Sequence, residues 1–299
     1  MSIFLRFLFL FAIAISPVTA RATIFEPNLP IISYVHFQSL DPTTPITVSG
    51  QLRVPSNITG KVPAVLVVHS SGGVDSRGKF YIDALNKAGI ATLEIDMWAA
   101  RGWFGGITGR PRGVPETLPD AYGALKFLSE QPRIDAARIG IMGFSWGGVV
   151  TMLSATQPYT SLYNGGLLKF AAHVAHYPVC WVYNRVPGYA FNSFTGAPVL
   201  IQAGELDAYD DPDTCPKLVQ SLPAWAQEFI TVKVYKDATH AWDRLQPSMT
   251  VTDPFSHKGM GGDVDFIPNV GAALKSRANA LRFFQNTFGL STHEHHDRD

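Results

Sequence analysis

The sequence predicts an α/β fold whose central sheet is mostly parallel, has about eight strands and carries helices on both faces. Short β-branched runs alternate with longer amphipathic segments along most of the chain, which is typical of right-handed strand–helix–strand crossovers. Residues 64–69 are almost wholly apolar, as expected for a central strand covered on both faces. Because no repeat or linker divides residues 23–290, we expect them to form a single domain, followed by a flexible tail at 291–299.

The individual elements follow from short apolar runs bounded by turn residues. The first two strands, 31–37 and 46–54, flank an Asp41-Pro42 turn, so the sheet is expected to begin with an antiparallel pair. Later strands are expected at 64–69, 90–95, 139–142, 171–176, 199–202 and 230–235. Helices are expected at 79–87, 116–130, 145–155, 216–226 and 270–288.

Two long segments interrupt this alternation. Residues 99–119 are rich in glycine and proline and include three arginines, and residues 242–269 form a second irregular stretch before the last helix. Both follow the carboxyl ends of strands, where open α/β sheets bind ligands. Loops of this length are uncommon in compact domains and are often functional.

Residues 1–22 have the layout of a secretory signal peptide. Arg6 precedes an apolar run at 7–15, and small residues then lead to cleavage near Ala20 or Ala22. The run is shorter than the roughly 20 residues that span a membrane, and an uncleaved anchor is the alternative. We therefore expect a secreted or periplasmic protein with no membrane association after cleavage.

Charge is balanced along the chain. The sequence holds 24 basic and 24 acidic residues and no polybasic block. Electrostatic attraction to nucleic acid or to an anionic membrane surface is therefore not expected.

Cys180 and Cys215 are the two cysteines of the chain. An even number in an oxidising compartment favours a disulfide, which would stabilise the fold by about 3–4 kcal/mol. Two separate buried thiols are the alternative. Two cysteines without a clustered histidine pair make a poor zinc site, so no metal is expected.

The segment Gly143-Phe144-Ser145-Trp146-Gly147-Gly148 follows an expected strand and opens an expected helix. A serine at such a turn is held in a strained conformation, and flanking glycines let neighbouring backbone pack closely. Its hydroxyl would be exposed as a nucleophile. A serine that only caps the helix is the alternative.

A serine nucleophile needs a base and an orienting acid. In this type of fold the acid and then the base follow the serine along the chain, each after a late strand. Asp207 stands just beyond the expected strand 199–202, and His240 follows the strand 230–235. They are therefore the expected acid and base, and His257 is the rival base. Three further acids crowd the same loop and are alternatives to the first, namely Asp210, Asp211 and Asp213.

Two backbone N–H groups are expected to stabilise the oxyanion of the transition state. One is that of Trp146, at the start of the helix after the nucleophile. The other should come from the small, glycine-rich loop that begins at His69; we expect the N–H of Ser71, with Ser70 as the alternative.

Together these residues resemble a known family. The motifs HSSGGVD at 69–75, GFSWGG at 143–148, GELD at 204–207 and ATHAW at 238–242 are similar to those of the dienelactone hydrolase family, which has the α/β-hydrolase fold. The resemblance implies Ser145 as nucleophile, Asp207 as acid, His240 as base, and the N–H groups of Ser71 and Trp146 as oxyanion donors.

The sequence also departs from this family. Its founding members carry a cysteine nucleophile and a glutamate in the loop after the third strand, where this chain has Ser145 and Ser70. They bind a substrate carboxylate with arginines; Arg244 matches one such place and Arg101 approximates the other. Four residues of the two long loops are expected to contact the substrate: Arg101, Trp103, Trp242 and Arg244.

The predicted function is that of an exported serine hydrolase that cleaves a carboxylic ester or lactone through an acyl-enzyme. Its partner would be a small-molecule ester, and neither a metal nor an organic cofactor is needed. Two alternatives use the same three residues, namely acyl transfer and peptide cleavage. The third alternative is a noncatalytic binding protein, which would not need all three.

Overall fold

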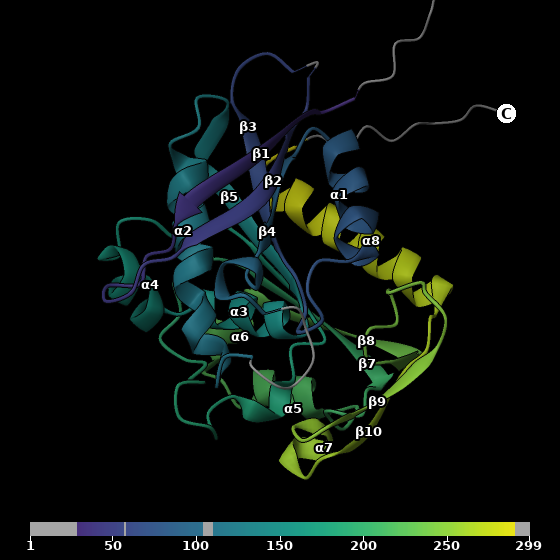
Figure 1. The fold of residues 1–299 in the computed structure, drawn as a ribbon. Helices are drawn as coiled ribbons and strands as arrows, with labels where there is room; N and C mark the ends of the chain where they lie inside the picture. The colour runs from purple at the N-terminus through teal and green to yellow at the C-terminus, as the bar shows by residue number, and fades with distance from the viewer. Residues whose placement is uncertain (1–28, 57, 104–109, 291–299) are drawn as a thin grey trace, which may run out of the picture.

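The computed structural model describes residues 29–56, 58–103 and 110–290. The expected signal peptide at 1–22 and the expected tail at 291–299 lie outside the described residues. Figure 1 shows a central sheet with helices packed around it. This arrangement confirms the predicted α/β-hydrolase architecture.

The sheet has eight strands in the order β1-β2-β4-β3-β5-β6-β7-β8. The first strand pairs with the second antiparallel, the second pairs with β4 antiparallel, and all later pairs are parallel. All eight expected strands are therefore confirmed. Their bounds are β1 Ile31–Gln38, β2 Thr47–Val54, β3 Val62–Val68, β4 Ala91–Asp96, β5 Ile134–Phe144, β6 His173–His176, β7 Val199–Leu206 and β8 Ile230–Thr239.

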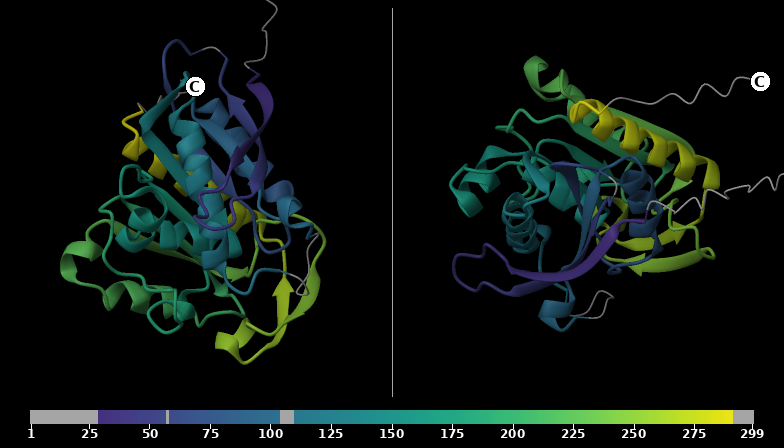
Figure 2. Two further views of the ribbon diagram at one scale, coloured as in Figure 1. Left: turned by 60° about the vertical axis from the view of Figure 1, so that its left-hand side comes forward. Right: turned by 90° about the horizontal axis from the view of Figure 1, so that it is seen from above.

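Helices cover both faces of this sheet, and Figure 2 shows the layers from two further directions. Strand β3 is buried throughout. Its alternate residues enter two separate apolar cores, as the two-residue period of a strand requires. Leu66 belongs to the core under α2 (Leu118–Ser129) and α3 (Trp146–Ser154). Val67 belongs to the opposite core, under α1 (Ser76–Lys87) and α8 (Val270–Thr287).

Three expectations for the helices and loops were wrong in detail. The expected helix at 216–226 is two helices, α5 (Thr214–Gln220) and α6 (Ala224–Gln227), because Pro223 interrupts it. A further helix, α4 (Gln157–Asn164), was not expected. The segment 242–269 contains an antiparallel hairpin.

That hairpin consists of β9 (Met249–Asp253) and β10 (Gly262–Phe266), with the short helix α7 (Ser256–Gly259) between them. Its strands are five residues long and each has a single buried residue. They therefore lack the buried apolar run that marked the central strands. None of the helices in the described part of the chain is long and apolar enough to span a membrane.

The expected disulfide between Cys180 and Cys215 is confirmed. It joins the short helix η3 (Cys180–Val182), in the loop after β6, to helix α5. Both half-cystines are buried. The bridge therefore links two segments at the carboxyl edge of the sheet.

Glycines permit a close crossing where β5 passes into α3. A side chain at Gly143 would place its Cβ 2.0 Å from the carbonyl oxygen of Gly147. One at Gly147 would meet the carbonyl oxygen of Val68, at the end of β3, at 2.2 Å. Both neighbours are backbone atoms, so neither can move aside cheaply.

Replacing Gly147 should therefore destabilise the protein. The variant Gly147→Ala is expected to lower the melting temperature by at least about 5 °C or to prevent folding, since the methyl group forces β3 and α3 apart. Gly271→Ala is the control, because its methyl would meet only Asn269 Oδ1 at 3.6 Å. Equal thermal unfolding of the two variants would contradict this account.

Strand β4 carries a carboxyl group on the face that packs against helix α1. The space for the Glu94 carboxyl exists because position 78 is glycine: a Cβ there would lie 1.7 Å from Glu94 Oε1. Burial raises the pKa of Glu94 from 4.5 to about 7, and Asp75 adds to the rise. Folding therefore disfavours the ionised carboxylate.

This raised pKa makes stability depend on pH. Because the folded-state pKa exceeds the unfolded one, the Glu94 contribution is fully present below pH 4.5 and is lost as the pH rises through about 7. Glu94→Gln cannot ionise and should be more stable than the wild type above pH 8, by up to about 3 kcal/mol. Thermal melts at pH 4 and pH 8.5 check this, with the exposed Glu228→Gln as control. A stability difference that does not change with pH would refute it.

Candidate active site

Ser145 lies at the turn between β5 and α3 in a conformation that non-glycine residues rarely adopt, with φ of 50° and ψ of −109°. Such a backbone persists only where surrounding contacts impose it. Its N–H donates to the carbonyl of His176 at 3.0 Å, and the N–H of Gly147 donates to that of His69 at 3.1 Å. The turn is thus fixed between the ends of β3 and β6, as predicted for a strand–serine–helix motif.

Ser145, His240 and Asp207 form a continuous hydrogen-bonded chain. His240 Nε2 lies 2.9 Å from Ser145 Oγ, and His240 Nδ1 lies 2.8 Å from Asp207 Oδ2. Asp207 follows β7 directly and His240 follows β8 directly. Both side chains are almost fully buried, so water does not compete for these bonds. The order and geometry are those of a nucleophile, its base and an orienting acid.

Each alternative acid in this loop has other partners. Asp211 pairs with Lys258 at 2.6 Å, and Asp213 pairs with Lys217 at 2.6 Å. The rival base His257 is exposed, and its Nε2 lies 3.0 Å from the carbonyl oxygen of Asp263.

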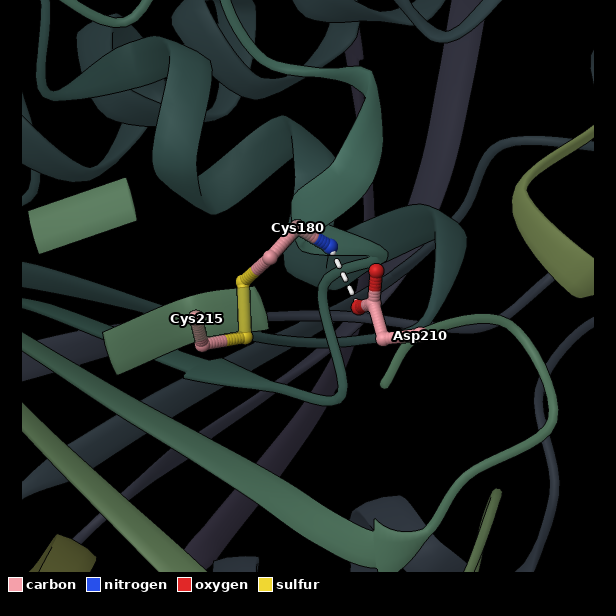
Figure 3. A group of neighbouring side chains, drawn as sticks. All are labelled: Cys180, Asp210 and Cys215. Atoms are coloured by element: carbon pink, nitrogen blue, oxygen red, sulfur yellow. Dashed lines mark hydrogen bonds between the residues drawn. A yellow bond between two sulfur atoms is a disulfide. The ribbon is translucent and has the colours of Figure 1, made fainter. Parts of the chain in front are cut away.

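Asp210 instead links the acid loop to the disulfide. Its carboxylate accepts the N–H of Cys180 at 2.6 Å (Figure 3). It also accepts the N–H of Trp181 at 2.9 Å. Burial raises the pKa of Asp210 to about 7, and the charge of nearby Asp207 adds to the rise. Although the two sulfurs and this carboxylate lie within 4.8 Å of one another, the sulfurs are bonded to each other. They are therefore not available as metal ligands.

The backbone N–H groups expected to bind the oxyanion belong to Ser71 and Trp146. Ser71 and Trp146 line the same pocket as Ser145, and their N–H groups have no hydrogen-bond acceptor among the described residues. The loop that carries Ser71 is a tight turn closed by the N–H of Gly73, which donates to the carbonyl of Ser70 at 3.0 Å. Free N–H groups beside a nucleophile can bind a developing negative charge.

His69 also supports this loop. Its Nε2 accepts the N–H of Met97 at 2.9 Å, so its proton is on Nδ1, which donates to the carbonyl of Ser70 at 2.7 Å. Burial lowers the pKa of His69 to about 4, and the ring is neutral at ordinary pH. This histidine is therefore part of the scaffold.

A pocket of about 470 Å³ opens beside Ser145, a size that suits a small organic ligand. Its walls come from the segment before α2, from α3, from the loop after β6 and from the hairpin. Most of the wall is apolar and includes Val114, Val149, Val179, Trp181, Val182 and Val186.

Arg110 is the more enclosed of the two arginines that line this pocket. Its guanidinium lies 5.7 Å from the ring of Trp146 and 4.8 Å from the ring of Phe255. It also lies 3.6 Å from the carboxylate of Asp253, on the hairpin. The pocket therefore holds a cation that is stacked between aromatic rings and partly neutralised by an acid.

The four expected substrate contacts do not line this pocket. Arg101 donates to Asp120 at 2.6 Å, on α2. Arg244 contacts Met249 instead, with its Nη1 2.9 Å from the thioether sulfur. Trp103 packs on Trp98 within the core, and Trp242 is fully buried against other aromatic rings.

The structure brings to the pocket residues other than these four expected contacts. Arg110 lies in the same loop as Arg101, Phe255 lies in the second long segment, and Trp181 directly follows Cys180. The available signals were the length of the two loops and the position of the disulfide beyond a strand end. These signals located the region without identifying the residues.

Comparison with known proteins gives a consistent family. The sequence model of the dienelactone hydrolase family matches residues 48–287. A probable 2-oxo-3-(5-oxofuran-2-ylidene)propanoate lactonase from Bradyrhizobium sp is 26% identical over 194 residues, which cover 62% of this chain and 75% of that protein. A putative carboxymethylenebutenolidase from Methylorubrum extorquens is 32% identical over 157 residues. That match covers 49% of this chain and spans 52% of the relative.

Solved structures show the same fold. A putative dienelactone hydrolase from Klebsiella pneumoniae superposes with a TM-score of 0.60 at 20% identity, covering 85% of this chain and 98% of that one. A dienelactone hydrolase-like promiscuous phosphotriesterase from metagenomic libraries gives 0.60 at 17% identity, with 86% and 98% covered. Since the family model spans most of the chain, the protein belongs to the dienelactone hydrolase family.

Proposed function

We propose that the protein is a serine hydrolase that cleaves a small carboxylic ester or lactone, with Ser145 as nucleophile, His240 as general base and Asp207 as orienting acid. Membership of the family makes it a hydrolase of ester or lactone bonds. The observation that carries the finer proposal is the unbroken chain of hydrogen bonds from Asp207 through His240 to Ser145, which ends at the mostly apolar pocket.

The reaction follows from this arrangement. Ser145 Oγ attacks the acyl carbon while His240 Nε2 takes its proton, and Asp207 stabilises the imidazolium that forms. The N–H groups of Ser71 and Trp146 stabilise the oxyanion. When the tetrahedral intermediate collapses, the alcohol leaves with the proton from His240. Water, activated by the same imidazole, then hydrolyses the acyl-enzyme and frees Ser145.

The relatives support a carboxylic ester or lactone as the substrate, since two of them are named as a lactonase and a carboxymethylenebutenolidase. The pocket wall is mostly apolar, which suits an ester whose acyl or alcohol part is apolar. Arg110 adds a cation near the oxyanion donors, so a substrate with a polar or anionic group could also be oriented there.

We further propose that the protein is exported and that residues 23–290 act as one domain. The buried disulfide supports export, because such bonds persist in oxidising compartments. The layout of residues 1–22 is that of a signal peptide. N-terminal sequencing of the secreted protein tests export by locating the cleavage site.

Ser145→Ala should abolish ester hydrolysis. Removal of the nucleophile is expected to lower kcat for p-nitrophenyl acetate by at least about 10⁴-fold, while thermal stability stays near that of the wild type. Ser129→Ala is the control, because that hydroxyl only donates to Lys126 of its own helix. A fluorophosphonate probe should label the wild type and the control but not Ser145→Ala. Hydrolysis at the wild-type rate by Ser145→Ala would disprove the assignment.

The acid is tested by a matched pair of substitutions. Asp207→Asn should lower kcat by about 10³–10⁴-fold, because the amide cannot stabilise the imidazolium and selects the wrong tautomer. Asp213→Asn, in the same loop but paired with Lys217, should leave kcat within about twofold. Steady-state kinetics with p-nitrophenyl acetate distinguish them. Similar kcat values for the two variants would show that Asp207 is not the orienting acid.

A further inference from the structure

The buried Arg77 contacts residues next to the proposed catalytic groups but does not line their pocket. Arg77 is in the first turn of α1 and is only 5% exposed. Its guanidinium contacts three separate groups: Nε and Nη2 donate to Asp75, Nη2 also donates to Ser70 Oγ at 2.6 Å, and Nη1 donates to the Tyr177 hydroxyl at 3.4 Å. A planar guanidinium can hold several acceptors in a fixed geometry, which an ammonium cannot.

The contact with Ser70 connects Arg77 to the loop at residues 69–73, called the oxyanion loop below because it carries the Ser71 N–H. Ser70 immediately precedes Ser71, the expected oxyanion donor, and its hydroxyl also accepts the N–H of Gly72 at 3.3 Å. Its carbonyl is held by His69. Arg77 therefore bonds to the hydroxyl of Ser70, and His69 bonds to its carbonyl. Together these bonds fix the peptide plane that carries the Ser71 N–H.

The contact with Tyr177 connects Arg77 to the segment at residues 240–243, called the base loop below because it carries His240. The Tyr177 hydroxyl donates to Asp243 Oδ1 at 2.7 Å. Asp243 lies three residues after His240 in the sequence. Asp243 is 1% exposed and also accepts the Tyr81 hydroxyl at 2.7 Å. The Tyr177 ring lies edge-on to the His240 ring, with centroids 4.7 Å apart. The tyrosine therefore orients the base through its ring and through Asp243.

We propose, on the basis of the proposed function, that Arg77 is a positioning residue that couples the oxyanion loop to the base loop. Through Ser70 it aims the Ser71 N–H at the developing oxyanion, and through Tyr177 and Asp243 it holds the His240 ring. A donor misaligned by a fraction of an ångström binds the oxyanion poorly, because these bonds act only at the reacting centre. Arg77 touches no part of the pocket, so its effect falls on the rate of reaction and not on substrate binding.

The expected kinetic effect separates positioning from a purely structural role. Ser70→Ala removes the link to the oxyanion loop and should lower kcat for p-nitrophenyl acetate by about 10–100-fold, with KM within about twofold. Arg77→Lys keeps the charge but cannot bridge the three partners, and should lower kcat at least as much. Arg53→Met is the control, since it breaks a different contact of α1, the ion pair of Arg53 with Asp83, and should keep the wild-type kcat.

A second readout reports the oxyanion donors directly. A thionoester develops negative charge on sulfur, which accepts hydrogen bonds weakly, so a well-aligned oxyanion hole favours the oxygen ester over its thiono analogue. Ser70→Ala and Arg77→Lys should lower the ratio of kcat/KM for p-nitrophenyl acetate to that for the thionoacetate by about tenfold. Tyr177→Phe keeps the ring on His240 but loses the bond to Asp243; it should lower both rates and leave the ratio unchanged.

The outcomes are decisive in each direction. Folded Ser70→Ala and Arg77→Lys with wild-type kcat and ratio would overturn the proposal, as would a loss confined to KM. If Arg77→Lys does not fold, Ser70→Ala alone decides. Failure of this proposal is distinct from failure of the proposed function, because the latter requires Ser145→Ala to remain active.

Discussion

The candidate site depends on the backbone of Ser145, which main-chain hydrogen bonds hold in a strained conformation with positive φ. Its N–H is bonded to His176, and the N–H of Gly147 is bonded to His69. Backbone strain of this kind costs about 1–3 kcal/mol, and a hydrogen bond contributes about 1 kcal/mol, so the turn exists only within this frame. The direction of α3, and with it the N–H of Trp146, follows from the same bonds.

The other members of the site are fixed by their own loops and not by attraction to the serine. Asp210 bonds to the segment of the disulfide, three residues after Asp207. Asp243 accepts two tyrosine hydroxyls in the core, three residues after His240. Each short spacing joins a functional side chain to a buried anchor. The distances among Ser145, His240 and Asp207 are consequently set by the fold before any substrate binds, as the proposed mechanism requires.

Local sequence patterns predicted the strands and the disulfide. They also predicted the location of Ser145, Asp207 and His240, because each of these three residues follows the end of a strand that the sequence pattern indicates. The pocket contacts could not be found this way. Whether Arg101 or Arg110 faces the pocket depends on where Asp120 and Asp253 lie, and those positions are set by packing between distant elements. An aromatic residue in a long segment, such as Trp242, gives no local sign that it is buried. Two five-residue strands with exposed faces were too short to be recognised.

The hairpin that supplies Phe255 and Asp253 to the pocket is docked partly through its backbone. The N–H of His257 donates to the carbonyl of Ala208 at 2.8 Å, and the N–H of Lys258 donates to that of Tyr209 at 3.2 Å. Main-chain hydrogen bonds do not depend on the identity of the side chains beside them. The pocket wall can therefore accumulate substitutions over evolutionary time while the acid loop beneath it keeps its place. In such an enzyme, selectivity for the substrate can diverge among descendants that retain one unchanged reaction.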